Sequence, residues 1–450
     1  MTQANSPSIA PQTIGILGGG QLAMMLAEAA IPLGFRCVFL EDSDNCPASL
    51  YGQVFKSDEL EAFIQASDVF TLEFENTPTK TVEKLAKLSS QKGSNKFGMF
   101  PPPIALDIAQ DRLKEKRMFN ELAIQTVPFE AVSSLEDLQS ACQNLGLPIV
   151  LKTSRGGYDG KGQVVVRTES DIANAWEELK DAVSGNGQLT STPAPLIAEG
   201  FVHFSREVSI IAARDQNGAV RCYDLVENHH FEGILAKTQA PAVGTSHLIQ
   251  PAQTAISKIM AHLDYVGVLA LELFVAKDER GNDYLVANEI APRVHNSGHW
   301  SIEGAITSQF ENHIRAVAGL PLGDTDNVHP SIMINVIGQY PDTSALLAID
   351  SVHYHSYHKT EREGRKIAHI TVMPNDVCDL EPALSKIIAV LPNKVGLDKT
   401  VTPAATSIKN VSLEDNSLDN SALKNNALAD NSKAEIEAVI NDTTDAKAAK

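Results

Sequence analysis

The feature that most constrains the fold is a glycine-rich loop between two β-branched runs, within residues 149–166. The runs Ile149–Leu151 and Val164–Val166 predict two strands of a hairpin, and the four glycines between them predict a loop. Glycine lets backbone amides approach an anion closely, and Lys152 and Lys161 add positive charge. The stretch is therefore typical of a hairpin that binds a polyphosphate; taken alone, it would also fit a mobile surface hairpin.

This loop differs from the P-loop of nucleoside triphosphatases. No Ser or Thr follows Gly160-Lys161-Gly162, and a strand is predicted where the P-loop requires a helix. Arg155 adds a third cation to the loop. Any polyphosphate would therefore be held by a hairpin and its cations, not by a helix N-terminus.

A second glycine-rich turn lies near the start of the chain. The predicted strand Thr13–Leu17 ends in Gly18-Gly19-Gly20, a helix follows, and the next strand, Arg36–Leu40, ends in Glu41-Asp42. This order predicts a β-turn-α-β unit of a doubly wound domain. Its GxGxxA turn fits a dinucleotide oxidoreductase, and it fits equally any domain that holds a phosphate at a helix N-terminus.

Acidic residues follow another predicted strand, Val69–Leu72. Glu73-Phe74-Glu75-Asn76 stands at the carboxyl end of that strand, where open parallel sheets bind their ligands. The sequence leaves open whether this segment lines a ligand site or is an exposed acidic loop.

Two glutamates are predicted to face each other in a later hairpin. If the strands Val268–Val275 and Tyr284–Ile290 turn about Arg280-Gly281, Glu272 lies opposite Glu289. Facing carboxylates repel, and a divalent cation between them removes that cost. Two solvated glutamates are the alternative. The polar run that follows, residues 293–299, suits an anionic substrate.

Other elements follow from hydrophobic periodicity and from helix start and stop signals. We expect helices over Ile104–Leu122, Ser133–Leu145 (with a capping box of Ser133 and Glu136), Asp171–Val183, Ser301–Gly319 and Pro382–Val390. We expect residues 196–202 and 206–213 to pair as strands. A smaller last domain is expected to contain the strands Ser331–Ile337 and Val352–Tyr357 and a basic hairpin at residues 358–366, which suits anion capture.

Composition restricts the class of partner. The net charge of −19 argues against nucleic acid, and the sequence has no apolar run long enough to span a membrane. The N-terminus lacks the features of a signal peptide. The five cysteines are dispersed, which is typical of reduced thiols, so we expect a cytoplasmic protein.

Taken in order, the motifs resemble those of the N5-carboxyaminoimidazole ribonucleotide synthetase family, ATP-grasp enzymes of purine biosynthesis. The segments that carry the resemblance are Gly18-Gly19-Gly20-Gln21-Leu22, Glu73-Phe74-Glu75-Asn76, Asp111-Arg112-Leu113, GGYDGKGQ at 156–163, Glu227-Asn228 and NEIAPRVHNSGH at 288–299. The resemblance implies an α/β fold with three ATP-grasp domains. Their expected limits are 13–103 for a doubly wound N-terminal domain, 104–320 for the lid and core, and 321–398 for a C-terminal domain, with a loose arm at 1–12 and a low-complexity tail at 399–450.

The resemblance also implies the site residues. ATP would be bound by Arg112, Lys152, Gly157, Tyr158, Asp159, Gly160, Lys161, Gly162, Gln163, Glu199, Gly200, Phe201, Val202, Glu207, His230, Asn288 and Glu289. The ribonucleotide would contact Gln21, Glu73, Tyr158, Asp159, Arg293, His295, Lys359, Arg365 and Lys366. Mg²⁺, or Mn²⁺ in its place, would bind Glu272 and Glu289, and the catalytic residues would be Lys152, Asp159 and Arg293.

The implied reaction is the ATP-dependent carboxylation of 5-aminoimidazole ribonucleotide by bicarbonate through carboxyphosphate, with release of ADP and phosphate. The resemblance further implies a homodimer, with neither nucleic acid nor membrane as partner. Besides the dinucleotide oxidoreductase, which rests on the GxGxxA turn alone, two alternatives stay open. One is another ATP-grasp ligase, of the formate-dependent glycinamide ribonucleotide transformylase or biotin carboxylase type. The other is a nucleotide-binding module without catalysis.

Overall fold

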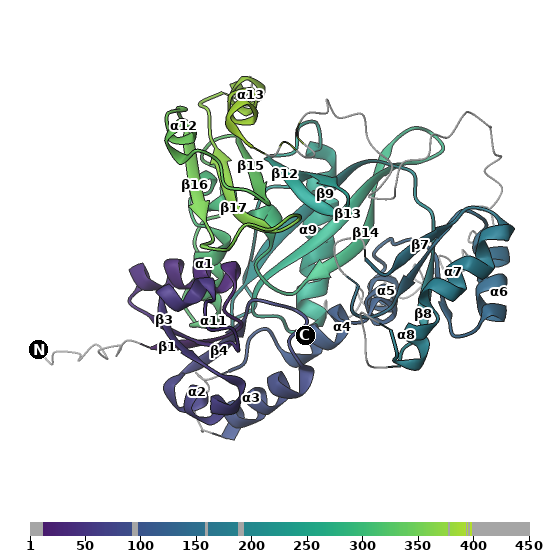
Figure 1. The fold of residues 1–450 in the computed structure, drawn as a ribbon, viewed down its shortest axis with the longest axis horizontal. Coiled ribbons are helices and arrows are strands. Elements are labelled where there is room, and N and C mark those ends of the chain that lie inside the picture. Colours follow the sequence, from purple (N-terminus) through teal and green to yellow (C-terminus); the bar gives the residue numbers. More distant parts are fainter. Residues whose placement is uncertain are drawn as a thin grey trace, which may run out of the picture.

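The computed structural model describes residues 12–91, 98–157, 161–187, 193–376, 379–392, 394 and 397, and these form three β-sheets with their helices (Figure 1). Within them, no helix is both long and apolar enough to cross a bilayer. Tyr158, Asp159, Gly160, most of the N-terminal arm and the tail 399–450 lie outside the described residues.

The N-terminal sheet is parallel and has the order β3-β2-β1-β4. Its strands and helices are β1 (Thr13–Leu17), α1 (Gln21–Ala30), β2 (Arg36–Leu40), β3 (Gly52–Phe55), α2 (Leu60–Ala66), β4 (Val69–Leu72) and α3 (Thr79–Gln91). Because β1 and β4 are parallel neighbours, their carboxyl ends meet at one edge. The turn Gly18–Gly20 and the segment that starts at Glu73 therefore lie side by side.

The second sheet is antiparallel and stands apart from the rest of the molecule, on the right of Figure 1. Its order is β5 (Phe129–Val132), β8 (Leu196–Gly200), β6 (Ile149–Thr153), β7 (Gln163–Val166), with α6 (Leu135–Leu145), α7 (Ile172–Leu179) and α8 (Asp181–Ser184). Apolar residues of α6 and α7 form one core with these strands. We call this sheet and its helices the lid. The predicted hairpin of β6 and β7 is confirmed, with Leu151 opposite Val164.

The third sheet runs through the middle of the molecule in the order β14-β13-β9-β11-β12-β15-β17-β16, and β10 pairs with β9. Its strands are β9 (Phe204–Arg214), β10 (Val220–Cys222), β11 (Val226–Phe231), β12 (Ile234–Ala240), β13 (Gly267–Lys277), β14 (Asp283–Ala291), β15 (Ser331–Ile337), β16 (Val352–Ser356) and β17 (Lys366–Val372). Helices α4 (Pro103–Ala109), α5 (Arg112–Glu121), α9 (Ser246–His262), α10 (Ser301–Gly304), α11 (Gln309–Val317), α12 (Thr343–Leu347) and α13 (Leu380–Val390) accompany it.

The central strands separate two apolar cores. On β13, Leu269, Leu271 and Leu273 pack into a core with α9, whereas Val268 and Ala270 pack into a core with α1 and α11. This alternation follows from the two-residue period of a strand. Glu272 shares its face of β13 with Ala270, so it points to the α1 side of the sheet, where the N-terminal domain lies.

Four expectations about local structure are wrong. Ile104–Leu122 is not one helix, because Asp111 is extended and caps the start of α5, accepting hydrogen bonds from the Leu113 and Lys114 amides. Ser301–Gly319 is also two helices, and Ser308 caps the second. Ser134, not Ser133, is the N-cap of α6 and accepts from the Asp137 amide. Asp171–Val183 is divided between α7 and α8.

One expected pairing is also corrected. Residues 196–202 and 206–213 do not pair with each other, because β8 joins the lid sheet and β9 joins the central sheet. The strands expected in the last domain extend the central sheet, since β15 pairs with β12. In each case the partner strand lies far away in the sequence.

The predicted pairing of Glu272 with Glu289 is confirmed, but it arises in an unexpected way. Lys277 pairs with Asp283 and Leu273 with Ala287, so the outer hairpin centres on Arg280 alone. A regular ladder would then place Asn288 opposite Glu272. Asn288 is instead an extra residue, a β-bulge, and the bulge brings Glu289 opposite Glu272.

Candidate active site

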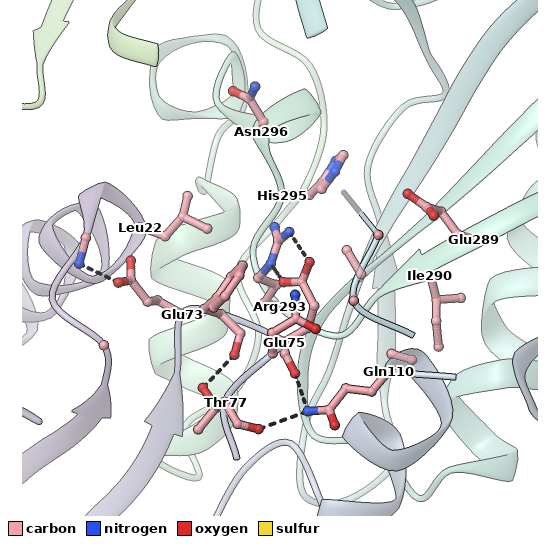
Figure 2. Close-up of a pocket in the computed structure, with 18 of the residues that line it drawn as sticks. Leu22, Glu73, Glu75, Thr77, Gln110, Glu289, Ile290, Arg293, His295 and Asn296 are labelled. Atoms are coloured by element: carbon pink, nitrogen blue, oxygen red, sulfur yellow. Dashed lines mark hydrogen bonds and ion pairs between the residues drawn. The ribbon is translucent and has the colours of Figure 1, made fainter. Parts of the chain in front are cut away.

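A cleft of about 1000 Å³ lies where the three sheets meet. Its walls come from the carboxyl ends of β1 and β4, from the lid hairpin, from β9 and β14 of the central sheet, and from the basic hairpin between β16 and β17. Figure 2 shows part of this cleft, with Glu73 and Glu289 on opposite sides and Arg293 and His295 between them. The arrangement joins segments that are more than 300 residues apart in the sequence.

Most described residues that were predicted to bind ATP, metal or ribonucleotide lie on the cleft wall. They are Gln21, Glu73, Arg112, Lys152, Gly157, Lys161, Gln163, Glu199, Glu207, His230, Glu272, Asn288, Glu289, Arg293, His295, Lys359, Arg365 and Lys366.

Four predicted ATP residues, Gly162, Gly200, Phe201 and Val202, do not line the cleft. The strand β8 ends at Gly200, whose amide donates to Pro128 O, and Val202 packs instead against an apolar cluster with Val127.

One lysine of the lid and one of α5 flank the buried carboxylate of Glu199. Lys152 Nζ lies 2.6 Å from Glu199 Oε2, and Lys116 Nζ lies 3.6 Å from the other carboxylate oxygen of Glu199. Burial by itself would raise the pKa of Glu199, but the two lysines prevail and lower that pKa to about 2. Glu199 is therefore ionised, and it fixes the position of the Lys152 ammonium at the cleft.

Arg112, from α5, connects the lid loop to the facing glutamates Glu272 and Glu289. Its guanidinium donates to the carbonyl oxygens of Thr153 (3.3 Å) and Gly157 (3.2 Å), and it lies 4.0 Å from Glu289 Oε2. Arg155 is different from what the sequence suggests: it is not on the cleft wall and forms an ion pair of 2.8 Å with Asp111. Among the described cations at or beside this loop, Arg112, Lys152 and Lys161 line the cleft and are the candidates for binding a polyphosphate.

The two facing glutamates have the chemistry of a magnesium site. Burial and the neighbouring Glu272 carboxylate raise the pKa of Glu289, whereas the hydrogen bond and charge of His295, 3.0 Å away, overcome the effect of burial and lower the pKa of Glu272 to about 2. Two facing carboxylates whose charges act on each other fit a hard divalent ion. The part of the chain that the structure describes shows no group of three or more His, Cys, Asp or Glu ligands, so phosphate oxygens would complete the coordination.

Glu207 lies across the cleft from the lid and pairs with His230. The His230 Nδ1 atom is 2.6 Å from Glu207 Oε2. Although burial alone would lower the pKa of His230, the hydrogen bond and charge of Glu207 raise it. The contact with His230 fixes the orientation of the Glu207 carboxylate, which suits hydrogen bonding to sugar hydroxyls.

At the first glycine-rich turn, a carboxylate occupies the helix N-terminus. Glu73 accepts hydrogen bonds from the amides of Gly20 and Ala23 (2.9 Å for the latter), as Figure 2 shows in part. Glu41 accepts from the Gly19 amide at 3.2 Å. In a dinucleotide site these amides would bind the pyrophosphate. The dinucleotide alternative therefore loses its support, because side chains of the protein already fill the turn.

Arg293 is held by Glu75, a residue of the acidic segment Glu73–Asn76 to which the sequence analysis gave no role of its own. Its guanidinium forms a two-point ion pair with Glu75, in which Nη2 lies 2.9 Å from Glu75 Oε1 (Figure 2). Gln110 holds the same segment, since its side-chain amide donates to the carbonyl oxygens of Glu75 (2.7 Å) and Thr77 (2.9 Å). The Arg293 head is therefore fixed beside Glu73 and His295.

The basic hairpin closes the far end of the cleft. Lys359, Arg362, Arg365 and Lys366 all line it, and the Lys359 ammonium donates to the Gln21 side chain. Burial, and then the charge of Arg365, lowers the pKa of Lys359 to about 8. Arg362 is an additional cation that the sequence left unassigned, although it belongs to the basic run that was predicted to capture an anion.

Sequence reasoning also missed Glu115, Lys116 and Asn296. Glu115 and Lys116 are buried in α5 although their residue types normally lie at the surface. Both side-chain polar atoms of Asn296 are enclosed and have no hydrogen-bond partner, and this residue lines the cleft. The signal for Asn296 was its place in the polar run 293–299.

Comparisons with known proteins agree with this geometry. Three family models match: the ribonucleotide synthetase preATP-grasp domain over residues 11–110, the ATP-grasp domain over 117–310, and the phosphoribosylaminoimidazole carboxylase C-terminal domain over 331–382.

Among curated proteins, the chain is 45% identical to an N5-carboxyaminoimidazole ribonucleotide synthase from Brucella melitensis, with 80% of this chain and 95% of that protein covered. It is 43% identical to one from Pseudomonas aeruginosa, with coverages of 84% and 99%.

Solved structures give the same answer. The synthetase from Thermus thermophilus is 42% identical, with a TM-score of 0.76 and coverages of 84% of this chain and 99% of that one. An enzyme from Aspergillus clavatus, solved with ADP and 5-aminoimidazole ribonucleotide, is 30% identical, with a TM-score of 0.73 and coverages of 85% and 98%. With its ATP-grasp fold and its three matching domains, this chain belongs to the N5-carboxyaminoimidazole ribonucleotide synthase family of ADP-forming ligases.

Proposed function

We propose that the cleft described above performs the ATP-dependent carboxylation of 5-aminoimidazole ribonucleotide in purine biosynthesis, and that it does so with the residues that line it. The observation that carries this assignment is the meeting of three groups in one cleft: the lid cations, the Glu272–Glu289 pair, and the basic hairpin. The first two groups suit a metal–nucleotide complex, and the third suits the phosphate of a ribonucleotide.

ATP lies between the lid and the central sheet in this proposal. Lys152 and Arg112 contact its phosphates, and Glu207 accepts hydrogen bonds from its ribose. Glu272 and Glu289 would hold Mg²⁺, or Mn²⁺ in its place, which neutralises charge on the phosphate oxygens when bound. The lid hairpin excludes water from the phosphates, because water would hydrolyse an activated intermediate.

The reaction then has two group transfers. A bicarbonate oxygen attacks the γ-phosphorus of ATP, the bond between that phosphorus and the bridging oxygen breaks, and ADP leaves with carboxyphosphate formed. The exocyclic amine of the ribonucleotide bonds to the carboxyl carbon, phosphate leaves, and the amine loses a proton. Lys152 stabilises the charge on the transferring group. Arg293, held by Glu75, is placed to bind the carboxylate of bicarbonate or of the product.

The ribonucleotide lies against the N-terminal edge and the basic hairpin. Its phosphate meets Lys359, Arg365 and Lys366, and its imidazole end points toward Glu73, Arg293 and His295, with Gln21 between the two ends. Tyr158 and Asp159 stay predictions for contact with substrate, and Asp159 for catalysis, because both lie outside the described residues. The domain limits, the homodimer and the cytoplasmic location also stay predictions.

Two alternatives are distinguishable from this proposal. An ATP-grasp ligase with another acceptor would keep the lid and the carboxylates but would not respond to 5-aminoimidazole ribonucleotide. A binding module without catalysis would not turn over ATP, and the presence of both facing carboxylates disfavours it.

The test is ADP release by the purified chain with MgATP and bicarbonate, with and without 5-aminoimidazole ribonucleotide, for the wild type and for Glu289→Ala. We expect strong stimulation by the ribonucleotide that is lost in the variant. ATP hydrolysis without stimulation would contradict the assigned acceptor, and the substrate residues named above would then be wrong as well.

A further inference from the structure

The bulge at Asn288 leaves part of β14 outside its ladder with β13. Glu272 faces Glu289 and Leu273 faces Ala287, so the peptide groups around Asn288 have no regular partner on β13. Backbone polar groups that are buried need hydrogen bonds from elsewhere. The partners of this bulge therefore decide whether it is stable.

Those partners come from α5 and from the segment that follows it. Lys116 Nζ donates to the carbonyl oxygens of Asn288 (2.9 Å) and Ala287 (3.4 Å), and Thr126 Oγ1 also donates to Ala287 O (2.8 Å). On the other side of the bulge, Glu115 Oε1 accepts from the Ile290 amide at 2.7 Å. Two consecutive side chains of α5 thus hold the bulge from both ends.

The burial of both side chains costs free energy. Glu115 and Lys116 are each only 2% exposed, and a buried charge destabilises a fold unless it is fully partnered. An apolar pair would fill the same space at lower cost, but it could not bind three successive peptide groups of β14. Lys116 also reaches Glu199 of the lid, so one ammonium contacts both walls of the nucleotide site.

The bulge determines which residue faces Glu272. If the ladder ran on without it, Asn288 would stand opposite Glu272 and Glu289 would turn to the other face of the sheet, because a slip of one residue reverses every side chain. That other face is the apolar core around Leu271 and α9. The pair of carboxylates exists only while the bulge persists.

We propose that Glu115 and Lys116 are positioning residues that hold the Asn288 bulge and thereby keep Glu289 opposite Glu272 for the divalent cation. Both side chains line the cleft, and their hydrogen bonds to β14 are made to its backbone. The role toward the cation rests on the proposed function, whereas the hold on the bulge does not.

The test uses four variants of the full chain. Glu115→Ala removes the acceptor for the Ile290 amide, and Glu115→Gln restores an oxygen at that place. Lys116→Met removes the donor with little change of shape. Lys114→Met is the matched control, because this neighbouring lysine of α5 pairs with Asp107 at a partly exposed position away from β14.

The first readout needs neither metal nor nucleotide. Amide hydrogen exchange of the protein alone is followed in peptides that cover residues 285–291 and, as an internal reference, residues 267–271 of β13. We expect faster exchange around the bulge in Glu115→Ala and Lys116→Met, with wild-type exchange in Glu115→Gln and Lys114→Met. Unchanged exchange around the bulge in both of the first two variants would overturn the proposal.

The second readout is the Mg²⁺ concentration for half-maximal ADP release. We expect it to rise about tenfold to a hundredfold in Glu115→Ala and Lys116→Met, while the KM for the ribonucleotide stays near the wild-type value. An equal loss in every constant, with faster exchange throughout the chain, would mean a general structural role and would overturn the proposal. If the wild type lacked the proposed activity, the exchange measurement would still decide whether α5 holds the bulge.

Discussion

Two glycine-rich turns of the molecule differ in the charge of the side chains that lie beside them. At the first, Gly18–Gly20, the carboxylate of Glu73 already binds the amides at the start of α1. At the second, the loop after β6, the neighbouring side chains are the cations Lys152 and Arg112, and both face the cleft. The first turn resembles a nucleotide motif more closely in sequence, yet the second is the one whose charge suits a nucleotide.

The two regions also shift the pKa of a buried glutamate in opposite directions. Burial raises the pKa of Glu73, and the amides of Ala23 and Gly20 offset this only in part. Burial would do the same to Glu199, but Lys116 and Lys152 outweigh it and lower the pKa to about 2. A glycine-rich turn is thus identified as an anion site by the charge around it, and its glycines alone do not establish one.

The largest expected effect tests the lid. Lys152→Met removes the cation that faces the transferring phosphoryl group, and we expect the kcat for ADP release to fall about 10²-fold to 10³-fold. Lys180→Met is the control, since Lys180 lies on the exposed side of the lid and pairs with Glu177. A fall of less than about tenfold in Lys152→Met would contradict the role of the lid cations.

The next effect is on stability at low pH. A pKa of Glu199 lowered from 4.5 to about 2 corresponds to about 3 kcal/mol of unfolding free energy. Because the folded pKa is lowered, this contribution is present above pH 4.5 and is lost as the pH falls toward 2. Urea unfolding at a series of pH values should show that the free energy of unfolding falls less steeply towards low pH in Glu199→Gln than in the wild type.

Glu73 is expected to change the pH dependence of stability in the direction opposite to that of Glu199. Its raised pKa means that the folded state binds the proton more tightly, so its contribution to stability falls as the pH rises above 4.5. In Glu73→Gln, the free energy of unfolding should therefore fall more steeply towards low pH than in the wild type. The same direction of change in both variants would contradict the difference between the two regions.

A smaller effect tests how closely Glu73 fills the first turn. Gly20 has an ordinary φ of −76°, but a Cβ atom there would lie 2.7 Å from Glu73 Oε1. We expect Gly20→Ala to lower the free energy of unfolding by about 1–3 kcal/mol. In the double variant with Glu73→Ala the crowding disappears, so the two losses should not add. Strict additivity in urea unfolding would show that Glu73 does not occupy the turn.

The smallest expected effect lies at the basic hairpin. With a pKa of about 8, Lys359 loses its charge in mildly alkaline solution. The KM for the ribonucleotide should rise about fivefold from pH 8 to pH 9, because the charged fraction of Lys359 falls from about one half to about one eleventh and a neutral amine binds phosphate poorly. Lys359→Arg keeps its charge and should remove this rise. A KM that stays constant over this range in the wild type would exclude Lys359 from the phosphate contact.

Much of the fold follows from local sequence. The hairpin of β6 and β7 and the parallel unit of β1, α1 and β2 were predicted at nearly their observed limits, because β-branched runs, glycine turns and helical periodicity act within a few residues. The break at Asp111 was also a local signal, since an aspartate two residues before Leu113 can cap a helix, but the apolar pattern on both sides concealed it.

Long-range pairing could not be predicted in this way. Nothing near residues 196–202 shows that β8 joins the lid sheet while β9, a few residues later, joins the central sheet. Prediction of the site residues from local sequence has the same limit. Glu272 and Glu289 were found from hairpin geometry, but Glu115 and Lys116 were missed, because their partners on β14 are more than 170 residues away.

The most direct test of the central claim is equilibrium binding of MgADP to Lys152→Met and Glu73→Gln, measured side by side by calorimetry with the wild type. If the nucleotide binds under the lid hairpin, the affinity should fall about tenfold or more in Lys152→Met and stay at the wild-type value in Glu73→Gln. The reverse result, with unchanged binding in Lys152→Met and weakened binding in Glu73→Gln, would place the nucleotide at the first glycine-rich turn and contradict the account.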